Sequence, residues 1–452
     1  MSGALTQDER YPWLTASSRQ VLDGLQEHPA APRFNHQCGD RLTDAGLGRV
    51  RAFERQVRAG AGWQPGVTPA WVAEIIAACF REVPFYRRYG GAPSRLADVP
   101  TCTRADLSRA PWAFVPDTLP LEDLIVYNTS GATGHPLEVL SHPEAASSYL
   151  PLLQAALRLH GVTLAGGRDP ASGRLGVALL LVCNQKRTYT YASVLSYLGG
   201  AGFAKLNLNP DDWRHPADRA RYIDACRPEV FTGDPLSFAT LAELPLEHKP
   251  KALISTAMQL LPGLRQTLEA RFQCPVIDLY AMHEAGPIAA ATPAGHVLLQ
   301  PRLYVEILDT DGQPSAPGER GEITLTGGFN PFLPLLRYRT RDYASLAWTG
   351  GQPALVGLEG RPPVTFRGAA GQTINNIDVT GALKPFALPA FQLHQAADGA
   401  LRLSAPFEQA APEAWRVALQ GLFGAEQALE IVPLDALGAG DRKIIQYTRE
   451  AG

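Results

Sequence analysis

Two kinds of segment alternate through the middle of this sequence, and that alternation limits the possible folds. An amphipathic helical pattern over residues 144–160 is followed by the continuous apolar run Leu175 to Cys183. A short run that is apolar throughout is typical of a strand buried on both faces, and repeated helix–strand alternation indicates a largely parallel sheet covered by helices. We therefore predict an α/β fold here, with further strands over 204–208, 229–232, 252–255 and 276–280 and helices over 191–198, 216–226 and 263–272.

The flanking regions follow other patterns. The first 120 residues are mainly helical, and Val83-Pro84 ends the helix predicted over residues 71–80 because proline cannot continue the hydrogen-bond ladder. Residues 297–358 show strand alternation and turns, which predict a β-rich subdomain. Beyond them, a helix at 414–422 lies between strand candidates at 401–403 and 429–432. We predict a large domain over residues 1–360 with mixed and parallel sheets, and a small, mobile C-terminal α/β domain over residues 361–452.

Composition excludes several classes of protein. With 452 residues, of which 45% are hydrophobic, the chain can bury a large core, and a net charge of −3 gives no general attraction for nucleic acid or anionic lipid. The six cysteines form no C-x-x-C pair, so neither a disulfide framework nor a zinc ribbon is indicated. No signal-peptide core or membrane-length apolar run is visible. We expect a cytoplasmic protein without nucleic-acid or membrane partners.

The segment Thr129 to Pro136 is a candidate phosphate-binding loop. It follows the apolar run Leu124 to Tyr127 and carries two glycines and three hydroxyl side chains, a composition that lets backbone N–H groups surround an anion. It has neither the Walker A spacing nor a dinucleotide-binding fingerprint. Loops of this kind are more often ordinary turns, so a nucleotide site needs support from elsewhere in the chain.

A second glycine-rich loop, Gly438 to Arg442, ends at Lys443 near the C-terminus. A lysine on a mobile loop of a small terminal domain suggests a positive charge that is brought to a site elsewhere. The alternative is a solvated surface lysine, which is the common case.

Several widely separated stretches resemble the motifs of adenylate-forming ligases. Residues Tyr280 to Glu284 resemble the family's Tyr-Gly-x-Thr-Glu motif, and Leu336 to Asp342 resembles its Tyr-Arg-Thr-Gly/Arg-Asp motif. Gly360-Arg361 is similar to the hinge, and Lys443 to the C-terminal catalytic lysine. Within this superfamily, Val83 to Tyr86 and Leu96 to Pro100 resemble the phenylacetate-CoA ligase branch.

The resemblance implies a two-step reaction: a carboxylate attacks the α-phosphate of ATP to form an acyl adenylate, and the acyl group then passes to a thiol. It implies that Glu284 binds Mg²⁺, that Asp342 holds the ribose, that Asp278 reaches the adenine amino group while Tyr280 stacks on the base, and that Lys443 contacts the reacting oxygens. It further assigns the phosphate loop to Thr129, Ser130, Gly131, Thr133 and Gly134, the other side of the adenine to Ser255, Thr256 and Ala257, and the hinge to Arg361. For several of these residues an ordinary structural role remains open: a surface acid for Glu284, a surface ion pair for Asp342, a core aromatic for Tyr280 and a linker anchor for Arg361.

The chain also departs from the family pattern. His135 replaces the lysine of the phosphate loop, and His283 replaces the threonine that bonds the α-phosphate. A histidine at position 283 would donate a hydrogen bond or act in the second step, or else be a packed, satisfied side chain. The family's Arg-Gly-Val-Asn segment is present only as Arg367 to Gln372, so CoA transfer is less well supported than adenylation.

The acyl pocket is predicted between two segments. The first is Tyr189 to Val194, with Tyr191 and a serine, and the second follows Glu284 and contains Gly286 and Pro287. Small residues leave room for a flat ring and tyrosines offer stacking walls, which favours an aromatic acid. The alternative is that the tyrosines are core residues of a helix.

These observations favour an ATP- and Mg²⁺-dependent aryl-acid ligase that transfers the acyl group to CoA or to the phosphopantetheine of a carrier protein. Transfer to an amine or another nitrogen nucleophile remains open, as does a non-catalytic nucleotide-binding regulatory protein. The helical N-terminal region either forms a homodimer surface or completes the large domain.

Overall fold

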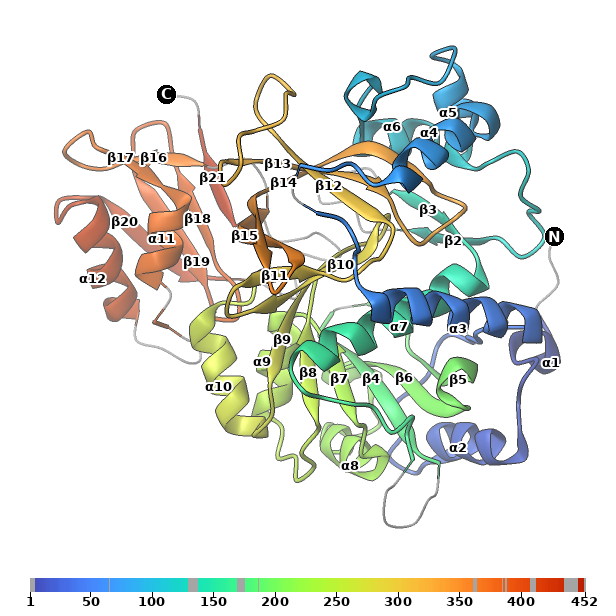
Figure 1. Ribbon diagram of the computed structural model, residues 1–452. Helices are drawn as coiled ribbons and strands as arrows, with labels where there is room; N and C mark the ends of the chain where they lie inside the picture. Colours follow the sequence, from blue (N-terminus) through green and yellow to red (C-terminus); the bar gives the residue numbers. More distant parts are fainter. Residues whose placement is uncertain are drawn as a thin grey trace.

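A computed structural model describes residues 5–64, 66–128, 137–168, 175–185, 187–360, 364–383, 385–386, 388–406, 412–434 and 446–450. One large sheet crosses the molecule, in the strand order β12-β13-β14-β15-β11-β10-β9-β8-β7-β4-β6-β5, with β1 paired to β14 (Figure 1). Its middle strands are parallel, in the order β6-β4-β7-β8-β9. These strands are β4 (Val177–Cys183), β6 (Ala201–Asn207), β7 (Val230–Gly233), β8 (Ala252–Ser255) and β9 (Val276–Met282).

Helices cover both faces of this parallel region. On one face α3 (Asp44–Ala59) and α7 (Pro143–Leu159) pack over alternate strand residues such as Ile254 and Leu279. On the other face, α2 (Ala16–Glu27), α8 (Asp218–Cys226), α9 (Pro235–Glu243) and α10 (Pro262–Phe272) pack over the intervening residues, such as Leu253. Burial on both faces explains why these strands are largely apolar, with exceptions such as Asp278 of β9.

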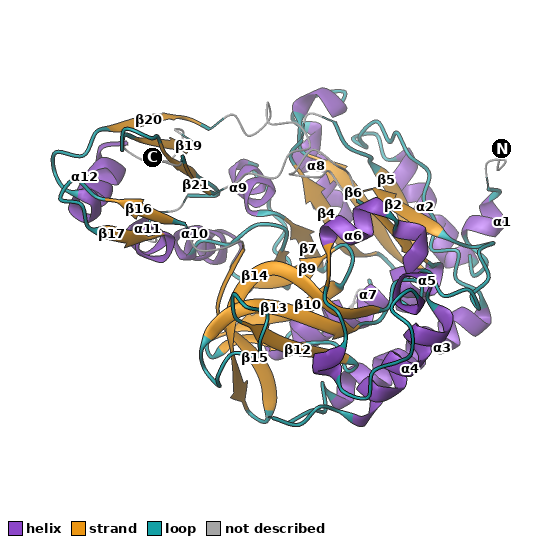
Figure 2. Ribbon diagram, turned by 90° about the horizontal axis from the view of Figure 1, so that it is seen from above, coloured by secondary structure: helices purple, strands orange, loops and turns teal. Residues whose placement is uncertain are grey.

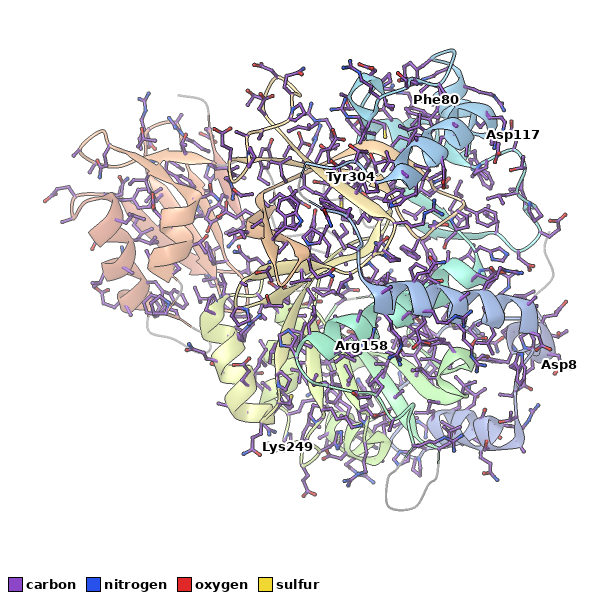
Figure 3. All side chains as sticks on the ribbon, viewed as in Figure 1. Asp8, Phe80, Asp117, Arg158, Lys249 and Tyr304 are labelled. Atoms are coloured by element: carbon purple, nitrogen blue, oxygen red, sulfur yellow. The ribbon has the colours of Figure 1, made fainter. Side chains whose placement is uncertain are left out.

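The β-rich half of the sheet is antiparallel and has its own core. It contains β10 (Gly286–Thr292), β11 (Gly295–Leu298), β12 (Leu303–Leu308), β13 (Arg320–Gly327), β14 (Leu335–Thr349) and β15 (Gln352–Gly360), covered by α4 (Ala70–Glu82), α5 (Pro84–Arg87) and α6 (Arg104–Arg109). Phe80 of α4 belongs to this core and Tyr304 of β12 packs against it (Figure 3). Strand β1 (Cys102–Thr103) runs parallel to β14, and the Thr103 hydroxyl caps α6. The N-terminal helix α1 (Gln7–Arg10) and the antiparallel pair β2 (Ile125–Asn128) and β3 (Glu138–Ser141) lie outside the large sheet.

The C-terminal part of the chain forms a separate small sheet with the order β20-β19-β18-β21. Figure 2 shows this unit beside α10, with α11 and α12 on one side of its sheet. Its elements are β16 (Thr365–Arg367), β17 (Thr373–Asn375), α11 (Asn376–Leu383), β18 (Gln392–Gln395), β19 (Leu401–Ala405), α12 (Pro412–Phe423), β20 (Leu429–Pro433) and β21 (Tyr447–Arg449). Trp415, Phe366 and Phe391 fill its core, and Leu261, which precedes α10, joins that core. The predicted fold class is thus confirmed.

One predicted helix is wrong, and two helices, α9 and α11, were not predicted. Residues 191–198 form β5 (Tyr191–Leu195) and a short 3₁₀ turn, because Ala192 and Val194 alternate into the core while β5 pairs antiparallel with the edge of β6. Helix α9 follows β7 directly. Asp234 accepts a hydrogen bond from the Ser237 backbone N–H, and a proline occupies the first turn of α9. An N-cap aspartate followed by proline is a helix-start signal that can be recognised in the sequence. In the described parts of the chain, no helix combines the length and the apolar character that a membrane span requires.

Candidate active site

Strand β9 places two candidate residues on one face of the sheet. Side chains alternate along a strand, so Asp278 and Tyr280 share a face while Ile277 and Leu279 point into the core under α3 and α7. Ser255, at the end of β8, pairs in register with Asp278 and lies on the same face. The face therefore carries polar groups where the parallel strands end, the edge at which open α/β sheets bind ligands.

Tyr280 connects this strand to the aspartate predicted to bind ribose. Its hydroxyl donates a hydrogen bond of 2.8 Å to Oδ2 of Asp342 on β14. Burial and the neighbouring Asp342 carboxylate raise the pKa of Tyr280 well above its usual value, so the phenol stays a donor at neutral pH. Thr340 fixes the backbone beside Asp342, since its Oγ1 accepts the Asp342 N–H at 3.0 Å. Two motifs separated by 62 residues are thus joined by one contact.

Glu284 lies in the connection between β9 and β10 and is only 3% exposed. Its Oε1 accepts a 2.6 Å hydrogen bond from the Tyr338 hydroxyl, and the Arg104 guanidinium lies 3.6 Å from the same oxygen. Burial, followed by the Glu284 charge, raises the pKa of Tyr338 well above its usual value. A buried carboxylate requires such partners, and they hold this one in a single orientation.

The donor set suits Mg²⁺ better than a metal bound entirely by protein side chains. Within the described ranges, no group of three or more His, Cys, Asp or Glu side chains is arranged to hold a metal ion. Mg²⁺ is commonly bound through one or two carboxylates together with substrate phosphates and water. The single oriented carboxylate of Glu284 is compatible with that mode of binding.

The residues predicted to line the adenine occupy the loop after β8. The Thr256 N–H donates to the Gly233 carbonyl at 2.9 Å, and Ala257 has a φ of +70°, a left-handed conformation that alanine rarely adopts. The Ser255 side chain is fully buried, and among the described residues its Oγ has no hydrogen-bond partner. An unpaired buried hydroxyl costs about 1–3 kcal/mol, so Ser255 is suited to meet a ligand.

The structure does not bring the two halves of the predicted acyl pocket together. Strand β5, with Tyr191, lies six strand positions from β10, with Gly286 and Pro287, which is about 29 Å at ordinary strand spacing. Tyr189 is 67% exposed, and the Val194 side chain is buried in the core. Gly286 has a φ of +65°, and a Cβ there would lie 2.1 Å from the Phe329 ring.

The other candidates are distributed as follows. His283 is exposed beside Glu284. The candidate phosphate-binding residues Thr129, Ser130, Gly131, Thr133, Gly134 and His135, the candidate hinge residue Arg361 and the candidate lysine Lys443 lie outside the described residues. Strands β2 and β3, which pair with each other, precede and follow residues 129–136 in the sequence.

The sequence did not indicate which side chains contact the candidate site residues. Tyr338 and Arg104 hold Glu284, Phe329 faces Gly286, and His296 lies 3.5 Å from Asp278. Tyr338 was within reach because it stands inside the Leu336–Asp342 motif. The others come from distant segments, and no local pattern indicated them.

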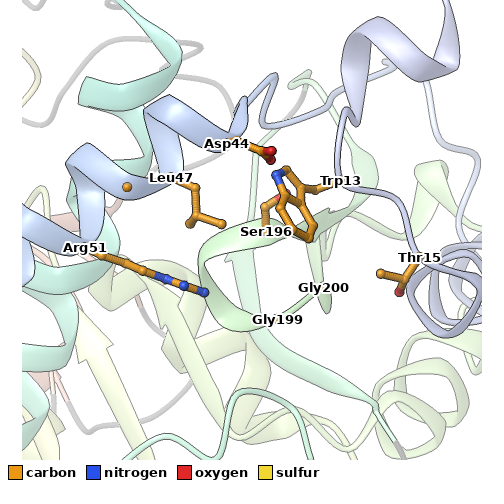
Figure 4. A pocket seen from close by; sticks show the side chains of 9 residues that line it. Trp13, Thr15, Asp44, Leu47, Arg51, Ser196, Gly199 and Gly200 are labelled. Carbon is orange, nitrogen blue, oxygen red and sulfur yellow. The ribbon is translucent and has the colours of Figure 1, made fainter.

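A surface pocket of about 280 Å³ lies apart from these residues (Figure 4). It is formed where α3 meets the N-terminal segment and the turn after β5. Its lining comprises Trp13, Thr15, Asp44, Leu47, Gly48, Arg51, Ser196, Gly199 and Gly200. No predicted site residue contributes to it.

Comparison with known proteins agrees with this geometry. The model of the family described as AMP-binding enzyme matches residues 99–330, just over half of the chain. The phenylacetate-coenzyme A ligase of Escherichia coli (strain K12) is 26% identical over 296 residues, covering 59% of this chain and 63% of that protein. The enzyme of the same name from Pseudomonas putida is 24% identical over 294 residues, with the same coverage. The match thus spans less than two thirds of either relative.

Among solved structures, 2-hydroxyisobutyryl-CoA ligase in the postadenylation state with 2-HIB-AMP superposes with a TM-score of 0.58. The sequence identity is 19%, and the match covers 89% of this chain and 90% of that chain. At this identity the likeness establishes the fold alone. The resemblance drawn from the motifs is confirmed, and the chain belongs to the family of AMP-binding enzymes, within which it resembles the phenylacetate-CoA ligases.

Proposed function

We propose that the chain uses ATP to adenylate a carboxylic acid, releasing pyrophosphate, and then transfers the acyl group to the thiol of CoA. Family membership supports the nucleotide, and the names of the related phenylacetate-coenzyme A ligases support both an acid substrate and a CoA acceptor. The match spans 63% of those relatives, so the complete reaction is an inference from their likeness.

The observation that carries the proposal is the hydrogen bond between Tyr280 and Asp342. It joins the ends of two motifs on a polar face of the sheet, between two apolar cores. A purely structural sheet would place apolar side chains there. An ionised carboxylate has two acceptor oxygens, to which two ribose hydroxyls would donate.

The first step needs charge neutralisation more than covalent help from the protein. A carboxylate oxygen attacks the α-phosphorus, and the bond from that phosphorus to the pyrophosphate oxygen breaks. Glu284 would hold Mg²⁺, which when bound neutralises phosphate charge. Tyr338 and Arg104 keep the Glu284 carboxylate in one orientation. We assign His283, exposed next to Glu284, as a donor to the phosphate.

In the second step the thiol sulfur attacks the acyl carbonyl carbon, AMP leaves, and the thiol proton is lost. We assign the phosphate loop to residues 129–136, the oxygen-contacting cation to Lys443 and the pivot to Arg361, which makes residues 361–452 the moving unit. The small C-terminal sheet with its own core is suited to move as a body.

An aromatic acid remains our preferred substrate. The Phe329 ring against Gly286 offers an aromatic wall beside β10, and the relatives named above are phenylacetate ligases. Carrier-protein phosphopantetheine and a nitrogen nucleophile are the alternative acceptors.

Pyrophosphate exchange into ATP, measured across a panel of aromatic and aliphatic acids, tests the proposal, and CoA consumption then tests the acceptor. We expect exchange with at least one aromatic acid, and a loss of about ten- to hundredfold for Asp342→Ala, because each hydrogen bond to a charged group contributes about 1.5–3 kcal/mol. The absence of exchange with every acid would contradict adenylation and favour a regulatory nucleotide-binding protein. Exchange without CoA turnover would contradict only the acceptor.

A further inference from the structure

A row of small and polar side chains crosses three strands beside the candidate nucleotide site. Asp278 on β9 pairs in register with Ser255 on β8. On its other side, the register of β9 with β10 places Ala291 opposite Asp278, one residue beyond the pair Leu279–Ala290, and Ala291 pairs with His296 on β11. Residues in register share a face, so all four side chains point the same way.

The alanine in this row lets two polar groups meet across an intervening strand. The Nε2 atom of His296 lies 3.5 Å from Oδ2 of Asp278. Backbones two strands apart are separated by about 10 Å, a gap that a histidine and an aspartate can close only over a small side chain. Ala291 provides this opening, and its carbonyl is anchored from α7 by Nε2 of His160 at 2.8 Å.

Among the described residues, polar atoms on both sides of Asp278 lack hydrogen-bond partners. In the part of the chain that the structure describes, neither Ser255 Oγ nor His296 Nε2 has a hydrogen bond, although both atoms are buried. The Asp278 side chain is 20% exposed, so its carboxylate still reaches the open side of the sheet. Buried polar atoms left unpaired in a native structure call for an explanation, and an absent ligand is one.

We propose that His296 is a positioning residue for Asp278. Its Nε2–H donates to one carboxylate oxygen and turns the other toward the 6-amino group of the adenine, while the Ser255 hydroxyl contacts the base beside it. This inference rests on the proposed function, since it specifies how the same site selects an adenine nucleotide. The 3.5 Å separation closes to hydrogen-bond length when the base fixes the carboxylate, as is common for contacts that tighten only in the complex.

The test uses two nucleotides that differ only at the position that Asp278 would contact. ATP has a 6-amino group, and purine riboside triphosphate has a hydrogen there. We expect the native chain to bind ATP about tenfold more tightly in isothermal titration, the effect of one hydrogen bond to a charged group. His296→Ala should weaken ATP binding by about tenfold and leave the analogue unchanged, whereas His296→Gln, whose amide N–H reaches the same oxygen, should restore discrimination.

Three further variants distinguish positioning of Asp278 from a general structural effect. Ala291→Val closes the gap with His296 intact, and we expect it to reproduce the loss of discrimination. His248→Gln changes a half-buried histidine whose Nε2 lies 2.7 Å from the Pro228 carbonyl, and it should leave discrimination unaltered. The double variant Asp278→Ala/His296→Ala should bind ATP as Asp278→Ala does, because His296 acts only through Asp278.

The possible results distinguish a failure of the positioning role of His296 from a failure of the proposed function. Equal weakening of both nucleotides in His296→Ala, or unaltered discrimination in both His296→Ala and Ala291→Val, would overturn the positioning role while ATP binding stands. A native chain that binds ATP and the analogue equally well would overturn the contact from Asp278 as well. Failure to bind either nucleotide would contradict the proposed function itself.

Discussion

Strand β9 presents two faces whose side chains differ in kind. Toward α3 and α7 it presents Ile277, Leu279 and Ala281, which pack in an apolar core. Toward the opposite side it presents Asp278 and Tyr280, which contact His296 and Asp342. Because side chains alternate along a strand, neighbouring residues can serve stability and ligand binding independently. The contrast predicts that substitutions one residue apart on β9 have separable effects.

The largest expected effect lies on the apolar face. Leu279→Ala removes a side chain that is 2% exposed and should lower the free energy of unfolding by about 2–5 kcal/mol in urea titrations. ATP binding to the folded fraction should be unchanged. Its matched partner, Asp278→Ala, should weaken ATP binding with a much smaller loss of stability. Equal behaviour of the two variants would remove the distinction between the faces.

Tyr338→Phe tests whether the polar side also contributes to stability. The change leaves the buried Glu284 carboxylate without its 2.6 Å donor and should cost about 1.5–3 kcal/mol in thermal or chemical unfolding. Tyr89→Phe removes the same hydroxyl from a ring that is 43% exposed, and should change stability by less than about 0.5 kcal/mol. Unchanged stability in Tyr338→Phe would mean that Glu284 is held by other contacts.

Gly286→Ala places a Cβ against the Phe329 ring in a left-handed backbone conformation. We expect a loss of about 1–3 kcal/mol in unfolding free energy. Replacing the ring as well, in Gly286→Ala/Phe329→Leu, should recover the stability lost to the steric clash but not the stability lost to the backbone conformation. If the double variant is no more stable than the single one, backbone conformation alone accounts for the glycine. A bulky residue at position 286 therefore tests packing before it tests acid specificity.

The smallest expected effect has the opposite sign. Ala257, two residues after the buried Ser255, has a φ of +70°. Ala257→Gly relieves this conformation but makes the unfolded chain more flexible. We expect a gain of up to about 1 kcal/mol in unfolding free energy. A measured loss of stability would show that the alanine methyl group packs favourably in this loop.

Much of the fold was accessible from the sequence because the parallel strands are short and largely apolar. Strand β8 has the predicted bounds 252–255, and α10 begins one residue before the predicted helix. A helix was predicted over residues 191–198 because the spacing of Tyr191, Val194 and Leu198 also fits a helical repeat. Pairing with β6 makes residues 191–195 a strand instead. Strand pairing depends on tertiary structure, which the local periodicity of the sequence does not reveal.

The candidate site, too, could be predicted from the sequence only in part. Motif spacing indicated Asp278, Tyr280, Glu284 and Asp342 as candidates, and the structure joins Tyr280 to Asp342. The side chains that orient them, such as Arg104 and His296, come from segments without a motif. Only the three-dimensional register reveals a contact made across Ala291.

The most direct test of the central claim is a crystal structure of the chain with a non-hydrolysable ATP analogue. The account predicts that the ribose hydroxyls lie within hydrogen-bond distance of Asp342, with the adenine on the Ser255–Asp278–Tyr280 face of the sheet. A nucleotide bound away from that face, for example in the pocket lined by Trp13 and Arg51, would contradict it.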